Sequence, residues 1–72
     1  MTKKEKQALL DVFRDTKRRQ FSDVVMHNVD YRATFAVVAE AQERMLKAAG
    51  ISDLEIAEIT NQVFFQSKAS RL

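Results

Sequence analysis

The single histidine of the chain, His27, lies four residues after Asp23 and three residues before Asp30. On a helix these spacings would place the three side chains on one face, where two carboxylates and an imidazole could bind a metal ion weakly. No thiolate can complete such a site, because the chain has no cysteine. A surface histidine beside a turn, paired loosely with acids, explains the same residues more simply. We therefore predict neither a metal site nor a cofactor at His27.

No other combination of residues indicates catalysis. A nucleophile needs a base and a group that orients the base, and one histidine with scattered serines supplies no such set. The carboxylate pairs Glu40/Glu43 and Glu55/Glu58 have helical spacing, which on a solvated face is ordinary charge patterning. A glycine-rich phosphate loop is excluded, since Gly50 is the single glycine. We therefore predict that the protein is not an enzyme.

Five basic residues near the N-terminus are better candidates for a binding function. On one helix they fall within an arc of about 120°, and such a stripe could lie along the phosphate backbone of DNA or structured RNA. The same stripe could be a solvated flank whose aliphatic stems cover the apolar face, and a net charge of +2 is modest for a nucleic-acid-binding protein. Nucleic-acid binding is therefore our alternative hypothesis, and its candidate residues are Lys3, Lys6, Arg14, Lys17 and Arg18.

Length and composition indicate a small all-α domain. Residues 1–72 make one domain at most. The chain has no proline and a single glycine, whereas a small sheet protein would need several tight turns. No apolar run approaches the length of a membrane span, and no apolar segment follows the basic N-terminus as it would in a signal peptide. We expect a cytoplasmic protein without membrane contact.

The small size also predicts self-association. A chain this short buries only ~60% of the surface that it exposes when unfolded, so a lone core is marginal. Disulfides, metals or oligomerisation usually offset this weakness, and the absence of cysteine removes the first of these. We therefore predict a three-helix domain, a helical hairpin followed by a third helix, that forms a homodimeric bundle.

Local signals place the ends of the first helix, with one ambiguity. Thr2 opens a T-x-x-E capping box, in which the hydroxyl and the carboxylate each accept from a backbone amide. The helix then either continues to about His27 or stops near Arg19, where Ser22 would cap a new helix. We favour the continuous helix, with a turn between His27 and Asp30, because the Asn and Asp of that segment are good helix breakers.

Residues 31–49 form the longest stretch of helical character, with Asp30 as the expected N-cap. Gly50 supplies the left-handed residue that ends this helix. Ser52 opens a second capping box, for a third helix over about 53–66. One face of the central helix is marked by residues at alternating steps of four and three: Tyr31, Phe35, Val38, Gln42, Met45 and Ala49.

The third helix carries apolar residues on two sides. One side, which includes Ile56 and Val63, is enough to dock on a three-helix core. Leu54 and Phe65 lie together on another side, and a second apolar patch with an aromatic residue indicates contact with a partner. We therefore predict a regulatory or adaptor protein that binds another protein through Leu54, Phe64 and Phe65.

Two short stretches resemble known families. The N-terminal MTKKEKQAL resembles the start of the plasmid repressor-of-primer family, dimeric helical hairpins that bind paired RNA loops, and the resemblance ends there. It implies RNA contacts for Lys3 and Lys6, with Phe13 as a loose counterpart of a family aromatic. The piece EIAEIT, residues 55–60, resembles the first helix of helix-turn-helix DNA-binding proteins. That resemblance implies a turn at Asn61, followed by a recognition helix.

Overall fold

A computed structural model describes residues 2–70, and within that range the chain is helical and contains no strand. The all-α prediction is confirmed, but there are four helices where three were expected. Three of them are long, and α2 is a single turn. In chain order they are α1 (Lys3–Gln20), α2 (Asp23–Met26), α3 (Val29–Ala48) and α4 (Asp53–Ser70).

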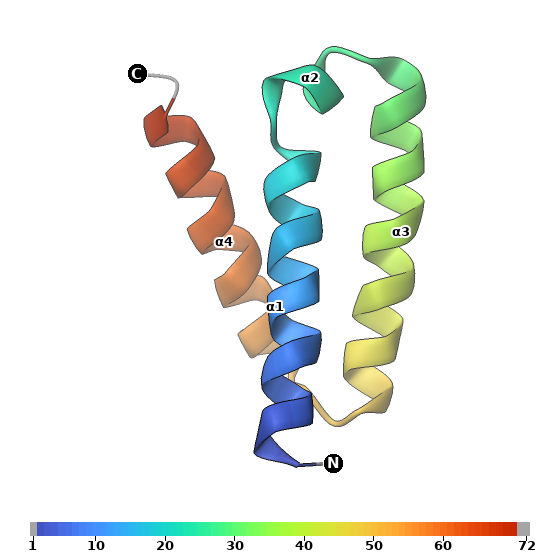
Figure 1. Cartoon of the computed structure of the whole chain (residues 1–72), viewed down its shortest axis with the longest axis vertical. Coiled ribbons are helices and arrows are strands. Elements are labelled where there is room, and N and C mark those ends of the chain that lie inside the picture. The colour runs from blue at the N-terminus through green and yellow to red at the C-terminus, as the bar shows by residue number, and fades with distance from the viewer. Residues whose placement is uncertain (1, 71–72) are drawn as a thin grey trace.

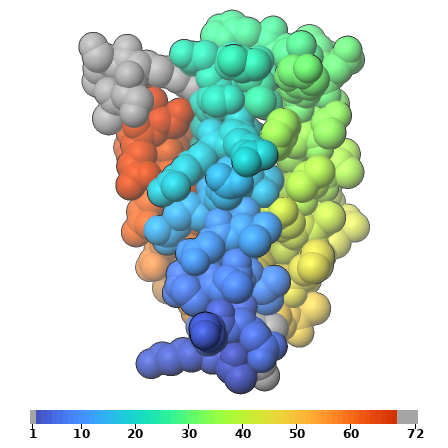
Figure 2. Space-filling model, in the orientation of Figure 1, coloured from blue at the N-terminus to red at the C-terminus, as the bar shows by residue number. Residues whose placement is uncertain are grey.

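The helix α1 lies between the other two long helices and packs against both of them (Figure 1). The predicted hairpin is formed by α1 and α3, which run antiparallel. The helix α4 then runs in the same direction as α1. From the N-terminal end of α1 the helices α3 and α4 diverge, so the molecule has a narrow end and a wide end. The short α2 lies at the wide end, and the α3–α4 loop lies at the narrow end. The side chains of α1 cover the middle of the face seen in Figure 2.

The first helix begins as predicted but ends earlier. The Thr2 hydroxyl accepts from the Glu5 backbone amide at 3.1 Å, as a capping box requires. The favoured continuous helix is wrong, because α1 ends at Gln20 and Ser22 adopts an extended conformation before α2. The Arg19 carbonyl at the helix end accepts from both the Ser22 amide, at 3.1 Å, and the Ser22 hydroxyl, at 2.7 Å. The alternative, a new helix after Ser22, is confirmed, and the break allows Val25 to be buried.

The N-cap of the central helix lies two residues before the predicted one. Asn28 has extended backbone angles, and its side-chain carbonyl accepts from the Tyr31 backbone amide at 3.1 Å. Asp30 is therefore not the cap, and that prediction is wrong. Asn and Asp cap helices about equally well, so the backbone path out of α2 decides which of the two residues is the N-cap. Asp30 instead lies in the first turn, where its negative charge suits the helix dipole. At 20 residues α3 is the longest helix, as predicted.

The predicted boundary between the central and third helices is confirmed. Gly50 has a positive φ of 87°, and the Ile51 amide donates back to the Leu46 carbonyl at 3.0 Å, which closes a Schellman-type end. The Ser52 hydroxyl accepts from the Glu55 amide at 3.2 Å. The third helix extends beyond its predicted end near Gln66, since α4 continues to Ser70. Residues 71–72 lie outside the described range.

The turn implied at Asn61 by the helix-turn-helix resemblance is absent. The helix α4 runs without interruption from Asp53 to Ser70, so EIAEIT is part of a plain amphipathic helix. The Thr60 hydroxyl donates to the Ile56 carbonyl one turn earlier, a hydrogen bond that Thr makes inside a continuous helix. This part of the chain therefore has no separate recognition helix.

Gly50→Ala should destabilise the protein by about 1–2 kcal/mol, the usual cost of a left-handed conformation for a residue with a Cβ. No atom lies within 4 Å of the position that a Cβ would take, so the whole cost comes from the backbone. A fall of roughly 4–8 °C in the melting temperature per kcal/mol is expected in thermal unfolding followed by circular dichroism. Gly50→Asn is the matched control and should cost less, since Asn tolerates this conformation better. Equal losses for the two variants would contradict this explanation.

The hydrophobic core lies towards the narrow end. Its largest fully buried members are Phe13 from α1, Leu46 from α3 and Val63 from α4. Leu9, Leu10 and Phe21 pack against the core as partly buried neighbours. Each long helix thus contributes one stripe, and α1 supplies the surface that both neighbours share. The buried cluster consists of Phe13, Leu46, Ile51, Ile56, Ile59 and Val63.

The predicted face of the central helix is only partly inward. Ala39 and Leu46 are the buried residues of α3. Each follows a residue of the predicted stripe by one position, so the inward face of the helix is rotated by about one residue from that stripe. Within that stripe Tyr31, Val38 and Met45 are exposed. The physical reason is that α1 is the long helix packed against α3, with the short α2 as a second neighbour, and these two leave another side of α3 uncovered.

A membrane-crossing segment is not found among the described residues, because none of the four helices combines the necessary length with enough apolar character.

Candidate interaction surfaces

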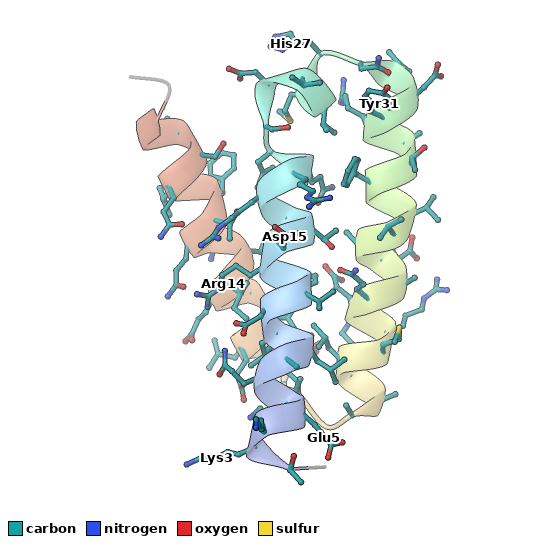
Figure 3. All side chains as sticks on the ribbon, viewed as in Figure 1. Lys3, Glu5, Arg14, Asp15, His27 and Tyr31 are labelled. Atoms are coloured by element: carbon teal, nitrogen blue, oxygen red, sulfur yellow. The ribbon has the colours of Figure 1, made fainter. Side chains whose placement is uncertain are left out.

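His27 is exposed at the wide end of the molecule, in the turn between α2 and α3 (Figure 3). Its Nδ1 lies 2.8 Å from the backbone carbonyl of Asp23, one turn earlier. Over residues 2–70, no three His, Cys, Asp or Glu side chains come close enough together to hold a metal ion. The simpler interpretation, a surface histidine beside a turn, describes this arrangement.

The basic stripe of α1 runs along the seam between α1 and its neighbours. The Lys6 Nζ lies 3.4 Å from a carboxylate oxygen of Glu55 on α4. Arg14 extends towards α4 (Figure 3) and is half-buried, and its Nε has no hydrogen-bond partner among the described residues. Arg18 is exposed and borders the α1–α4 seam near the wide end. Lys3 is exposed in the first turn. The stripe is therefore partly engaged by the protein itself.

Lys17, the fifth member of the stripe, is buried. Only 8% of the residue is exposed, and its Nζ lies 5.6 Å from the centre of the Phe13 ring and 5.7 Å from that of Phe21. Its carboxylate partner is Glu43 on α3, at 4.0 Å. The Lys17 ammonium group lies near two aromatic rings and the Glu43 carboxylate, and it links α1 to α3. Little of Lys17 is exposed for contact with a phosphate backbone. Phe13, the counterpart of the RNA-binding aromatic, is fully buried.

Two of the three predicted protein-binding residues lie together at the wide end. The Phe64 ring packs edge-on against Phe21 at 5.5 Å between centroids, and the Phe65 ring lies 6.1 Å from Phe64. Phe65 remains 66% exposed and Leu54 69% exposed. Leu54 belongs to the first turn of α4, about 16 Å along the helix from Phe65 at 1.5 Å per residue. The structure therefore brings the two phenylalanines together with Phe21 and leaves Leu54 at the other end.

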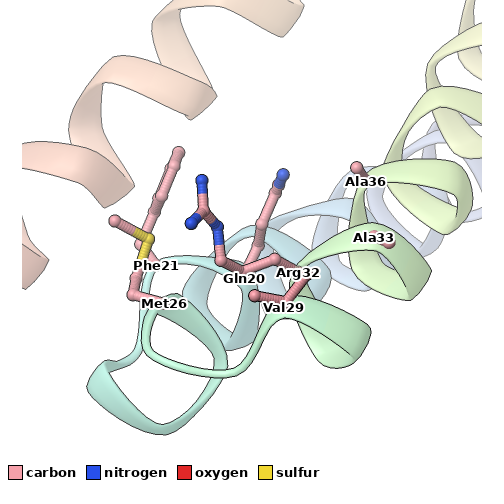
Figure 4. Close-up of a pocket in the computed structure, with 7 residues that line it drawn as sticks. All are labelled: Gln20, Phe21, Met26, Val29, Arg32, Ala33 and Ala36. Atoms are coloured by element: carbon pink, nitrogen blue, oxygen red, sulfur yellow. The ribbon is translucent and has the colours of Figure 1, made fainter.

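A groove opens where α3 and α4 diverge. Its larger part is a hollow of about 480 Å³ between the end of α1, α2 and the first half of α3 (Figure 4). A smaller part of about 180 Å³ lies between α2 and the last turns of α4. Phe21 and Met26 line both parts, so the two hollows adjoin each other. We call this surface the aromatic groove; its residues are Gln20, Phe21, Met26, Val29, Arg32, Ala33, Ala36, Phe64, Ser67 and Lys68.

Polar groups in the groove are few, and the charged ones are basic. The Arg32 side chain reaches across the larger hollow in Figure 4, and Lys68 lines the smaller one. No acidic residue lines either part. The Gln20 side-chain carbonyl is buried without a hydrogen-bond partner among the described residues, so it is an open acceptor in the wall of the groove.

The α3 side of this groove could not be read from the sequence. Val29, Ala33 and Ala36 form no stripe of large apolar residues, and their position depends on the early end of α1. The signal that was available is the weak apolar pattern between Phe13 and Phe21, followed by Ser22 as a possible cap.

No protein family model matches this chain, and neither a curated protein nor a solved structure matches it.

Proposed function

We propose that this chain is a non-enzymatic regulatory or adaptor protein that acts as a homodimer and binds another protein through the aromatic groove. The observation that carries the proposal is the cluster of Phe21, Phe64 and Phe65 beside an open groove, at the wide end of the molecule. Clustered aromatic residues in a partly desolvated depression are typical of the residues that dominate protein–protein binding energy.

The shape and charge of the groove favour an amphipathic helix as the bound element. Two diverging helices, α3 and α4, form its walls, and a third helix laid between them would complete a four-helix arrangement. Small residues on one wall, Ala33 and Ala36, allow the backbone of such a helix to approach closely. Arg32 and Lys68 favour acidic residues on the flanks of the partner helix.

Phe65→Ala should weaken binding of such a helix by at least about tenfold, because it removes a large exposed aromatic beside the groove, whose ring packs on Phe64 in the groove wall. The test starts with a display selection of helical peptides on the wild-type protein. Affinities of the selected peptides are then measured by fluorescence anisotropy. Selected peptides should carry apolar residues at i, i+3, i+4 and i+7, with acidic residues beside them.

Leu54→Ala is the matched control for that measurement. Leu54 is about as exposed as Phe65 and lies on the same helix, but away from the aromatic groove. It should leave the affinity within about twofold and the melting temperature unchanged. If Phe65→Ala unfolds the protein, or if both variants weaken binding equally, the groove is not the binding surface.

The nucleic-acid alternative has less support. Lys17 is buried, Arg14 is half-buried and Lys6 is ion-paired with α4, which leaves Lys3 and Arg18 as the exposed members of the predicted stripe. Retention of the wild-type protein on duplex DNA or structured RNA, falling steeply with added salt, would favour this alternative over the proposal.

A further inference from the structure

The outer side of α3 carries a second apolar surface, separate from the aromatic groove. Six residues at alternating steps of three and four lie along it, and all six are exposed. Its large members are Tyr31 at 52%, Val38 at 41% and Met45 at 59% exposure. Alternating steps of three and four are the spacing of a helix that pairs with another helix along a coiled-coil seam. We call this surface the outer α3 stripe; it consists of Tyr31, Thr34, Val38, Ala41, Met45 and Ala48.

The stripe contains no charged residue, and the polar groups near it are satisfied within the chain. The Thr34 hydroxyl donates to the Asp30 carbonyl at 3.0 Å. The Arg44 guanidinium lies 2.6 Å from the Glu40 carboxylate, one turn away on the flank of the stripe. Covering the stripe would therefore bury apolar surface without leaving a polar side chain of the stripe unpaired, apart from the Tyr31 hydroxyl.

Large and small residues alternate along the stripe, and this pattern is complementary to itself when reversed. An antiparallel copy centred between Ala39 and Glu40 places every large side chain opposite a small one. Such alternation lets facing layers interdigitate at a short distance between helix axes. A parallel copy would stack each large residue on its own equivalent and align the two helix dipoles unfavourably. The antiparallel pairs are Tyr31 with Ala48, Thr34 with Met45, and Val38 with Ala41.

The chain exposes more surface than a monomer of its mass is expected to expose, and the excess is about the area of one side of an interface. The chain exposes 5331 Å². A folded monomer of 8.3 kDa is expected to expose only about 4,600 Å². The excess of roughly 750 Å² is close to the ~800 Å² that each partner buries in a standard protein–protein interface.

We infer that two copies of this chain associate through their outer α3 stripes, antiparallel, about a two-fold axis between Ala39 and Glu40. The inference rests on the homodimer of the proposed function and specifies its interface. None of the six stripe residues lines the aromatic groove. Self-association and partner binding therefore use different surfaces, and each can fail without the other.

Single-cysteine variants test this arrangement, because the chain has no cysteine of its own. Thr34→Cys is made with an affinity tag and Met45→Cys without one, so that the products differ in mass. The two positions are about 16 Å apart along α3, whereas a disulfide needs Cα atoms within about 7 Å. In the inferred dimer each variant alone forms no intermolecular disulfide on oxidation, and the mixture gives the mixed disulfide, at least about tenfold above either homodimeric disulfide.

Three results would overturn the inference. Homodimeric disulfides from each variant alone would show a parallel pair. Equal amounts of mixed and homodimeric products would show collision without a defined interface. No disulfide, together with a monomeric wild-type protein in sedimentation at 100 micromolar, would show that no dimer forms. Ala36→Cys, in the aromatic groove, is the control for random collision and should give no product with either variant. Phe65→Ala, added to each cysteine variant, should leave the mixed product unchanged, which separates this test from that of partner binding.

Discussion

Phe13→Ala should remove roughly half or more of the free energy of unfolding. Phe13 is fully buried where the stripes of α1, α3 and α4 meet, and it contributes the largest side chain of the core. Truncation of a buried phenylalanine costs about 3–5 kcal/mol. A domain of this length holds a total stability of only about 4–10 kcal/mol. The measurement is urea unfolding followed by far-ultraviolet circular dichroism. All proteins are measured at one concentration, because the stability of a dimer depends on protein concentration.

Val12→Ala is the control for Phe13→Ala. Val12 is the preceding residue on the same helix and is 55% exposed, so its truncation removes little buried surface and should cost less than about 1 kcal/mol. If the two variants cost the same, Phe13 is not the centre of the core and the packing of α1 described above is wrong.

Glu43→Gln should destabilise the protein more than Lys17→Met. Lys17 keeps 10% of its side chain exposed, and Glu43 is its carboxylate partner on α3. Removing that carboxylate leaves a buried ammonium group with only the Phe13 and Phe21 rings nearby, at a cost of roughly 1–2 kcal/mol. A methionine at position 17 keeps most of the apolar stem and has no charge to bury. It should therefore change the free energy of unfolding by less than about 1 kcal/mol in either direction.

The double variant Lys17→Met/Glu43→Gln completes the cycle. If the cost of Glu43→Gln comes from an unpaired lysine, the loss should disappear once the lysine is gone. Urea unfolding of the four proteins measures the coupling. Additive effects would show that the two charged groups, which lie 4.0 Å apart, have no net interaction.

These variants separate the two ends of the molecule. Phe13 and its neighbours hold the narrow end together, where all three long helices meet. At the wide end, Phe64 packs on both Phe21 and Phe65 beside an open groove. We therefore expect substitutions at the narrow end to change stability and those at the aromatic groove to change binding. Phe21 takes part in both and should change both.

What the sequence determined by itself is mostly local. The Thr2 and Ser52 caps and the left-handed Gly50 were all identified correctly, because each depends on residues within one turn of the helix end. The all-α class followed from the lack of turn-forming residues, which is also independent of long-range contacts. The exposure of Leu54 and Phe65 followed from their place on a side of α4 opposite the core residues.

What only the tertiary structure decided is which face of each helix turns inward and where α1 stops. Ser22 and the Asn28–Asp30 segment offered competing breaks, and the early break places Val25 in the interior. Tyr31, Val38 and Met45 looked like an ordinary buried stripe, but α1 is the long helix that packs against α3, and Ala39 and Leu46 are buried instead. A helical period marks a stripe that needs cover, and it does not say whether a neighbour in the same chain or a second molecule supplies that cover.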